Sequence, residues 1–292
     1  MNKMTKLTAL LAVFGLVFLG SYAYAGEGEM MYQPAGWNSF EASFLIGHRV
    51  YGAGSYDQGQ ISDFVVDQSH GRIALVVLSD VPGFGSKEVA IPCGVLTRTA
   101  WGSFTINFPP DTEIGPLGFD TTPYAQAMAP GEIHGAIDPS WAESVYMHYG
   151  QAPYWKEAAM GWSTEFYRGS RLIGAEVQLA EGGTAGKVDD FVVDFSDGHI
   201  PLAVLSDVPG RGDTRVAVPF GSLSRRADNT FALNFTGEKL ASAPGFDQFR
   251  DLNNRGYAEG VYRYFGVQPY WTEVGGMHEG GTMDYNYMDY DY

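Results

Sequence analysis

Hydrophobic and polar positions follow the same order in two stretches of the chain. The first reads FVVDQSHGRIALVVLSDVPG over Phe64–Gly83, and the second reads FVVDFSDGHIPLAVLSDVPG over Phe191–Gly210. Their offset, 191 − 64 = 127 residues, holds without a gap over residues 45–108 of the first copy. The chain is therefore a tandem duplication, and a repeated unit of this length is a domain rather than one turn of a solenoid.

Each copy predicts several short strands joined by turns. Asp67–Gly71 has the composition of a hairpin connection, because Asp bonds to the turn backbone and Gly tolerates a positive φ. In the next strand, Ile73, Leu75 and Val77 are large in both copies, so we expect them to face the core while their neighbours face away. Pro201 lacks a backbone donor, which predicts an edge strand or an N–H position without a partner. This pattern indicates a small closed or nearly closed β-barrel.

A short helix is predicted after each barrel. Aromatic and apolar residues recur at helical spacing from Trp141 and again from Tyr257, and each run ends in Gly followed by Pro-Tyr-Trp. Ser140 and Glu143 have the spacing of a capping box, and the glycine fits the position just after a helix C-terminus. We expect each helix to cover an open end or side of its barrel.

The strand pattern resembles a known family. LIG-x-x-V, G-x-[IV]-x-D-F-V-V-D, a turn ending in Gly, an apolar strand and V-A-[IV]-P are similar to the PRC-barrel family over residues 44–108 and 171–235. That family includes the cytoplasmic module of the photosynthetic reaction-centre H subunit and the C-terminal module of a ribosome maturation factor. The resemblance implies an adaptor that docks onto proteins and has no catalytic residues. The predicted fold class is mainly β, with two tandem small PRC-barrel-like β-barrels, each followed by a short capping helix.

The N-terminal 25 residues predict a secretory signal peptide. A basic start is followed by the apolar run Leu7–Gly20 and an A-x-A cleavage signal at Ala23–Ala25, and no later stretch is long and apolar enough to span a membrane. We therefore expect export to the periplasm or the extracellular space. The predicted divisions are a signal peptide (1–25), a flexible lead (26–43), the first unit with its helix (44–157), a linker (158–170), the second unit with its helix (171–273) and a disordered acidic tail (274–292).

Composition excludes several classes of function. The formal net charge of −16 repels nucleic acids and anionic lipids. Cys93, the only cysteine, is matched by Phe220 in the second copy, which indicates a buried apolar site rather than a reactive thiol. None of the six histidines has a metal-ligand spacing. Glu143 and Glu259 are interpreted as helix-capping carboxylates rather than an acid/base pair. The sequence thus predicts no catalytic residue, no metal and no cofactor.

The candidate partner-binding residues lie in the two Pro-Tyr-Trp segments. They are Tyr154, Trp155, Tyr270 and Trp271. One interpretation is a hydrophobic clasp that holds each helix on its barrel; the other is an aromatic docking patch, because Tyr and Trp dominate interface hot spots. The main functional hypothesis is an exported, non-enzymatic structural or protein-docking module with an unidentified envelope partner. The alternatives are a carbohydrate-binding envelope protein that uses the Tyr-Trp pairs and, as a second alternative, a hydrolase.

Overall fold

The computed structural model describes residues 38–52, 56–99, 103–106, 137–156, 165–226, 230–252 and 254–272. All of them fall within a single compact unit. We call residues 38–156 the first half and residues 165–272 the second half. The predicted signal peptide, most of the predicted lead and linker, and the predicted tail lie outside the described residues. No helix in the described ranges is long and apolar enough to cross a membrane.

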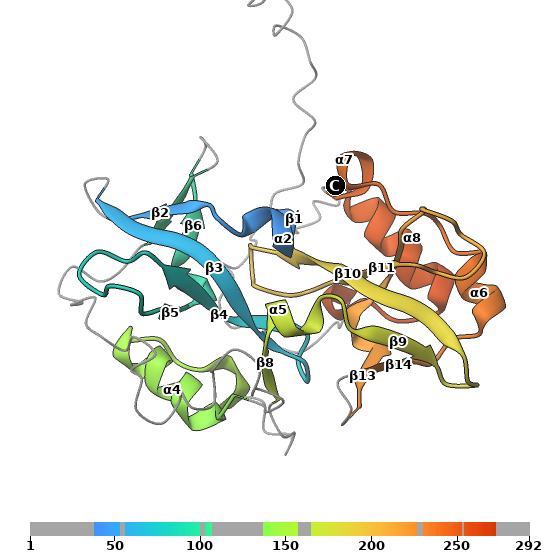
Figure 1. Cartoon of the computed structure of the whole chain (residues 1–292), viewed down its shortest axis with the longest axis horizontal. Helices are drawn as coiled ribbons and strands as arrows, with labels where there is room; N and C mark the ends of the chain where they lie inside the picture. The colour runs from blue at the N-terminus through green and yellow to red at the C-terminus, as the bar shows by residue number, and fades with distance from the viewer. Residues whose placement is uncertain are drawn as a thin grey trace, which may run out of the picture. The chain divides into compact units, whose positions relative to one another are not determined.

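The first copy forms a sheet in the order β5-β4-β3-β2-β7-β6 (Figure 1). Its strands are β2 (Arg49–Tyr51), β3 (Asp57–Asp67), β4 (Arg72–Ser79), β5 (Val89–Pro92), β6 (Leu96–Arg98) and β7 (Phe104–Ile106). Neighbouring strands are antiparallel, except β2 and β7, which are parallel.

The second copy repeats this arrangement in the order β12-β11-β10-β9-β14-β13. Its strands are β9 (Glu176–Leu179), β10 (Thr184–Asp194), β11 (Leu202–Ser206), β12 (Val216–Pro219), β13 (Leu223–Arg225) and β14 (Phe231–Leu233). The parallel pair is now β9 and β14, in the same topological position. The predicted duplication and the mainly β fold class are confirmed.

In the part of the chain that the structure describes, hydrogen bonds do not close either sheet into the predicted barrel. In the first copy β5 and β6 lie at opposite ends of the strand order. The 3-10 turn η2 (Cys93–Val95) joins them through the chain, and η4 (Phe220–Ser222) does the same in the second copy. A proline ends β5 and a turn follows at once, so the chain changes direction there. Among the described residues, β5 and β6 form no ladder with each other.

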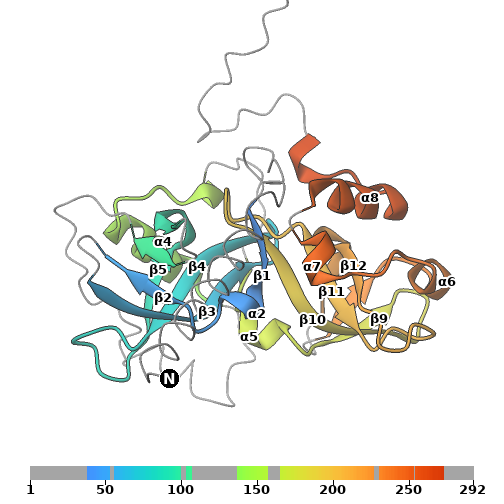
Figure 2. The ribbon, with the colours of Figure 1, turned by 90° about the horizontal axis from the view of Figure 1, so that it is seen from above.

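Two short strands are exchanged between the halves. The strand β1 (Ser39–Glu41) belongs to the first half but pairs with β10, and β8 (Phe166–Arg168) belongs to the second half but pairs with β3. Figures 1 and 2 both show β1, in blue, beside the yellow β10. The two strands are equivalent, since they differ by the same 127 residues. The predicted boundaries assigned them to the lead and the linker, whereas the structure includes them in the sheets.

The hairpin connections have the predicted chemistry. In the first half Asp67 Oδ1 accepts hydrogen bonds from the backbone N–H groups of Ser69 and His70, at 3.0 and 3.1 Å. In the second half Asp194 Oδ1 accepts from the N–H of Ser196 at 2.9 Å. The glycine near the end of each turn has a positive φ, 62° at Gly71 and 78° in its copy. These residues specify the turns locally, which explains why the sequence predicts them.

The prediction that only one face of β4 is buried is wrong. Leu75 is fully buried as expected, but its neighbours Ala74 and Val76 are also 0% exposed. The helix that follows the sheet covers the second face, and the hydroxyl of its Tyr146 donates to the Ala74 carbonyl at 2.8 Å. Strands buried on both faces read as continuous apolar runs. The smaller side chains at alternate positions of β4, such as Ala74, therefore face the helix at close range and do not face solvent.

Pro201 predicts either an edge strand or an N–H position without a ladder partner, and the structure shows the second outcome. The strand β11 lies between β10 and β12, and it begins at Leu202, one residue after the proline. The missing N–H of Pro201 therefore leaves no gap in a ladder, which was the other outcome that the sequence allowed. Its carbonyl accepts from the Phe220 N–H at 3.1 Å and from the Tyr262 hydroxyl at 2.8 Å.

A helix follows each sheet, as predicted, but its N-terminus is capped differently. The helices are α4 (Pro139–His148) and α8 (Arg255–Phe265). The caps are Asp138, which accepts from the Ser140 N–H at 2.8 Å, and Asn254, which accepts from the Tyr257 N–H at 3.1 Å. The predicted capping box at Ser140 is therefore wrong. Gly150 and Gly266 end the two helices with φ values of 65° and 72°. The second half also contains the short helices α6 (Gly237–Ala241) and α7 (Gln248–Asp251).

Truncation of the central leucines tests the core assignment. Leu75→Ala and Leu202→Ala are each expected to lower the free energy of unfolding by about 2–5 kcal/mol, because each removes buried methyl groups from a small core. Met147→Ala on α4 is a suitable control, since that side chain is 65% exposed and should change stability by no more than about 0.5 kcal/mol. Urea melts give all three values. Equal losses at Leu75 and Met147 would contradict the assignment.

Candidate functional site

The first Pro-Tyr-Trp segment packs against its own chain. Its residues Tyr154 and Trp155 lie in the 3-10 turn η3 (Tyr154–Lys156) and are half-buried. The Tyr154 hydroxyl donates to Asp67 Oδ2 at 2.9 Å, and the Arg72 guanidinium carbon lies 4.4 Å from the Tyr154 ring centroid. Trp155 contacts Phe166 at 4.9 Å between ring centroids. Since Phe166 is in β8, this clasp holds the strand supplied by the second half.

The second segment, in η5 (Tyr270–Thr272), is built alike. The Tyr270 ring stacks on His199, with centroids 4.0 Å apart and planes 14° from parallel. Trp271 lies edge-on to Tyr262 of α8 at 5.0 Å, and the Arg255 guanidinium carbon lies 5.5 Å from the Trp271 ring centroid. Both predicted site pairs therefore anchor a helix to a sheet. Whether their remaining exposed area also binds a partner stays a prediction.

Burial keeps these tyrosines neutral. It raises the pKa of Tyr154 well above its usual value, and the nearby Asp67 carboxylate adds to the rise. The pKa of Tyr270 is raised in the same way, first by burial and then by Asp197 and Asp194. A neutral tyrosine can donate its hydroxyl proton, which the bond from Tyr154 to Asp67 requires. The arrangement is suited to holding the fold together.

Reciprocal hydrogen bonds join the halves where the strands are exchanged. Ser170, in α5 (Gly169–Leu172), donates its N–H to Asp63 Oδ1 at 3.0 Å and its hydroxyl to Asp63 Oδ2 at 2.6 Å. Ser43, in α2 (Ala42–Leu45), donates its N–H and its hydroxyl to Asp190 in the same way. The two pairs are related by the 127-residue offset. The junction therefore has the character of an interface between two like subunits.

The ion pairs at this junction break the symmetry, because their charges are inverted. On the first strand, Glu41 pairs with Arg215 at 2.5 Å. At the equivalent positions, Arg168 pairs with Glu88 at 2.7 Å, and Arg168 also binds Asp63 at 2.6 Å. This inversion is visible in the sequence: Glu41 matches Arg168 in the other copy, and Glu88 matches Arg215. That signal could have revealed the junction from the sequence alone, although the prediction did not include it.

Charge inversion makes the junction selective. If the first strand were to pair with a copy of its own half, Glu41 would lie beside Asp63 and Glu88 without a cation. Three carboxylates in a partly buried site repel one another and lose hydration. In the observed arrangement Arg168 fills that place, and hydrogen bonds and charges from Glu88 and Asp63 raise the pKa of Arg168 despite its burial. The first half therefore fits the second half better than a copy of itself.

The pH dependence of stability should report on Glu41. Burial raises the pKa of Glu41, and Asp190 adds to the rise while Arg215 opposes it. The folded state therefore binds a proton here more readily than the unfolded state, so this group's contribution to stability falls as pH rises through the raised pKa. Urea melts of wild type and Glu41→Gln from about pH 4 to pH 7 should give a stability difference that shifts in favour of the variant. A shift towards wild type would contradict this assignment.

The other residues singled out from the sequence have structural roles. Burial raises the pKa of Cys93 to about 12, which keeps the thiol protonated and unreactive. Glu143 pairs with Lys156 and Glu259 with Arg255, so neither carboxylate caps its helix N-terminus as predicted. The described residues include no group of three or more His, Cys, Asp and Glu side chains that could hold a metal.

The described structure is thus a duplicated small β-domain whose halves share strands. The comparison with protein families identifies the family of this domain. The PRC-barrel domain profile matches residues 38–110 and 164–238. Together these matches cover half of the chain, and the chain belongs to the PRC-barrel family. Both matches include the exchanged strands, which supports their place in the domain. A search of curated proteins finds no match.

Proposed function

We propose that this protein is an exported, non-enzymatic PRC-barrel module that docks onto another protein of the cell envelope. PRC-barrel domains are small non-catalytic β modules, and the two domains here are joined by exchanged strands. The observation that carries the proposal is an exposed apolar pair at the junction of the halves. Phe44 is 56% exposed and Ile46 is 43% exposed, although both are large and apolar.

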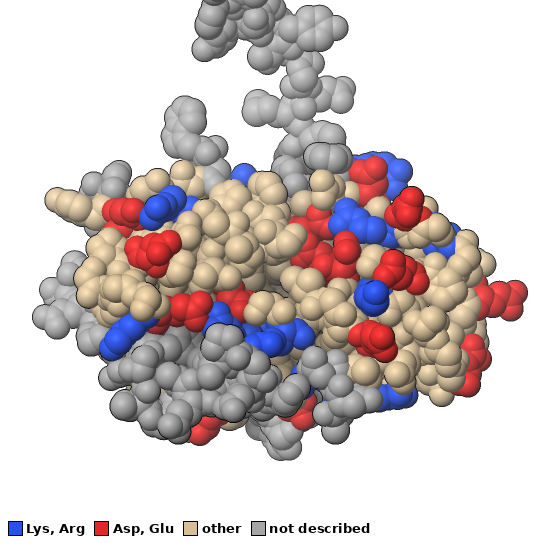
Figure 3. Space-filling view, viewed as in Figure 1, with Lys and Arg blue, Asp and Glu red and all other residues tan. Residues whose placement is uncertain are grey.

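This pair lies where a partner could contact both halves. Ile46 and Ile173, at equivalent positions, line a small apolar groove of about 180 Å³ together with Phe64 and Phe191. Figure 3 shows an uncharged area over α2 with acidic and basic side chains beside it. An apolar centre with a charged rim is typical of protein–protein interfaces. The carbohydrate-binding alternative requires open faces on the Tyr-Trp pairs, but Arg72 and His199 each cover one tyrosine face.

Capture from an envelope extract tests docking. Wild-type protein is expected to recover a specific protein partner, and the double variant Phe44→Ser/Ile46→Ser should lose it with little change in the urea melt. Met147→Ser is the matched control, because that residue is also large, apolar and exposed, yet lies on α4. Equal capture by wild type and the double variant would contradict docking at this pair. Recovery of no partner, together with turnover of an envelope polymer, would contradict the function.

Export is tested separately. Mass analysis of the mature protein should show an N-terminus at Gly26, because cleavage follows the A-x-A signal. A mature chain that retains Met1 would contradict cleavage of the predicted signal peptide.

A further inference from the structure

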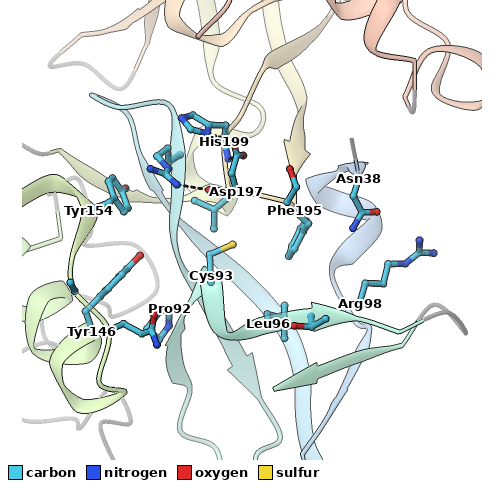
Figure 4. Close-up of a pocket in the computed structure, with 18 residues that line it drawn as sticks. Asn38, Pro92, Cys93, Leu96, Arg98, Tyr146, Tyr154, Phe195, Asp197 and His199 are labelled. Carbon is cyan, nitrogen blue, oxygen red and sulfur yellow. Dashed lines mark hydrogen bonds and ion pairs between the residues drawn. The ribbon is translucent and has the colours of Figure 1, made fainter. Parts of the chain in front are cut away.

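A polar pocket of about 780 Å³ lies between the first sheet and the β10–β11 turn of the second half (Figure 4). One wall is made by β4, η2, β6 and the α4–η3 segment, and the other by Phe195–His199. The two hairpins hold this geometry reciprocally, since Ile73 N–H donates to the Gly198 carbonyl at 2.7 Å and Ile200 N–H donates to the Gly71 carbonyl at 2.8 Å. A pocket of this volume accommodates a small organic molecule.

A difference between the two copies contributes to this space. Cys93 lines the pocket, with its sulfur towards the turn of the second half (Figure 4). The equivalent Phe220 is fully buried, stands against Phe191 at 5.5 Å between ring centroids, and lies close to Gly71 of the opposite turn. A thiol is much smaller than a phenyl ring. The first copy is therefore open where the second copy is filled.

Two arginines give the pocket a positive character. Among the described residues, neither Arg72 nor Arg98 forms an ion pair with a carboxylate. Arg72 donates through Nη2 to the Asp197 carbonyl at 2.5 Å, and its buried Nε has no partner in the described part of the chain. Arg98 is exposed and lies over the Phe40 ring at 4.6 Å. Both arginines line the same pocket, although the chain as a whole has a net charge of −16.

The acidic side chain in the pocket already has a partner. Asp197 Oδ2 lies 2.7 Å from Nδ1 of His199. Burial would raise the pKa of Asp197, but the hydrogen bonds and charge of His199, with the charge of Arg72, lower it overall. Asp197 therefore stays ionised and is compensated by its neighbours, so that among the described residues Arg98 has no carboxylate partner and can bind an anion from solution.

Aromatic walls complete the arrangement. In Figure 4 Tyr146 and Tyr154 lie on one side of the pocket, Arg98 lies on the other, and Phe195 lies between Cys93 and Asn38. The Arg72 guanidinium lies over the Tyr154 ring and is therefore held on the side of the pocket that the tyrosines form. An arginine fork matches the two oxygens of a carboxylate, and aromatic rings pack against the flat body of a ligand.

We propose that this pocket binds a small organic carboxylate with a ring, either a sugar acid or an aromatic acid. The carboxylate is held by Arg98, and the ring lies against the tyrosines and Phe195. This binding is separate from docking at Phe44 and Ile46, because neither of these two residues lines the pocket. Either proposal can fail while the other stands.

Calorimetric titration of the full exported chain tests the pocket with glucuronate, benzoate and inorganic phosphate as probes. One of the two carboxylates is expected to bind saturably, and Arg98→Gln should weaken that binding at least tenfold. Cys93→Phe, which copies the second half, should abolish it by filling the space. Arg171→Gln is the control, because Arg171 is also exposed but lies outside the pocket.

Each outcome decides the matter. Glucuronate binding alone assigns a sugar acid, and benzoate binding alone assigns an aromatic acid. Binding of phosphate only would overturn the carboxylate proposal, as would the absence of saturable binding by all three probes. Carboxylate binding that Arg98→Gln leaves intact would also overturn it. Because Arg98 is exposed, this variant should fold normally, so the test does not depend on the fate of Cys93→Phe.

Discussion

Arg168→Glu is expected to lower the free energy of unfolding by about 3–5 kcal/mol. Arg168 is the only cation that the described structure places between Asp63 and Glu88, and its side chain is only 16% exposed. Breaking a buried ion pair leaves uncompensated charge, which costs more than the pair itself contributes. The new carboxylate would add a third negative charge and weaken the pairing of β8 with β3.

Adding Glu88→Arg to the same chain should restore most of that stability. The double variant places the new carboxylate opposite the new guanidinium, which reproduces the arrangement of Glu41 and Arg215 at the other exchanged strand. Arg171→Glu serves as the control, since this exposed arginine should change stability by no more than about 0.5 kcal/mol. Urea melts of wild type, the two single variants and the double variant form a double-mutant cycle. A double variant that loses as much as the sum of the single variants would contradict the role of charge inversion.

Trp155→Ala and Trp271→Ala are each expected to cost about 3–5 kcal/mol, because each removes a large ring from between a helix and a sheet. Trp155→Ala should also loosen the exchanged strand, since the Trp155 ring contacts Phe166. Tyr56→Ala is the aromatic control, as this side chain is 73% exposed. Urea melts measure all three changes.

These tryptophan variants also separate the two interpretations of the Pro-Tyr-Trp segments. A clasp predicts lost stability. A docking patch predicts a nearly unchanged melt and partner binding weakened by about 2 kcal/mol or more. If Trp155→Ala and Tyr56→Ala melt alike, the clasp is wrong.

The sequence predicts the duplicated sheets well because their information is local. The apolar run Ile73–Leu78 predicts β4, and the Asp–Gly turns fix its hairpin without help from distant residues. The resemblance to the PRC-barrel family adds the small β-domain fold, whereas the order of the strands comes from the structure. The helix positions are likewise predicted from periodicity, and only their caps differ. Asp138 caps the first helix in place of Ser140 because it accepts the Ser140 N–H and precedes Pro139 at the first helical position.

The exchanged strands could not be predicted in the same way. Ser39–Glu41 and Phe166–Arg168 are three residues long, too short to show a period, and their partners lie far away in the sequence, in the other half. The anchoring role of Tyr154 depends on Asp67, which is distant in the sequence, and that of Trp155 depends on Phe166, which lies in an exchanged strand. Such contacts follow from tertiary packing, which a single sequence encodes only indirectly.

The two PRC-barrel domains form one body through their exchanged strands. Differential scanning calorimetry of the full chain tests whether the two domains unfold together. A shared body should unfold in one transition, with a calorimetric enthalpy equal to the van't Hoff enthalpy. Two resolved transitions, each with the enthalpy of a single domain, would show that the halves fold independently and would contradict the claim.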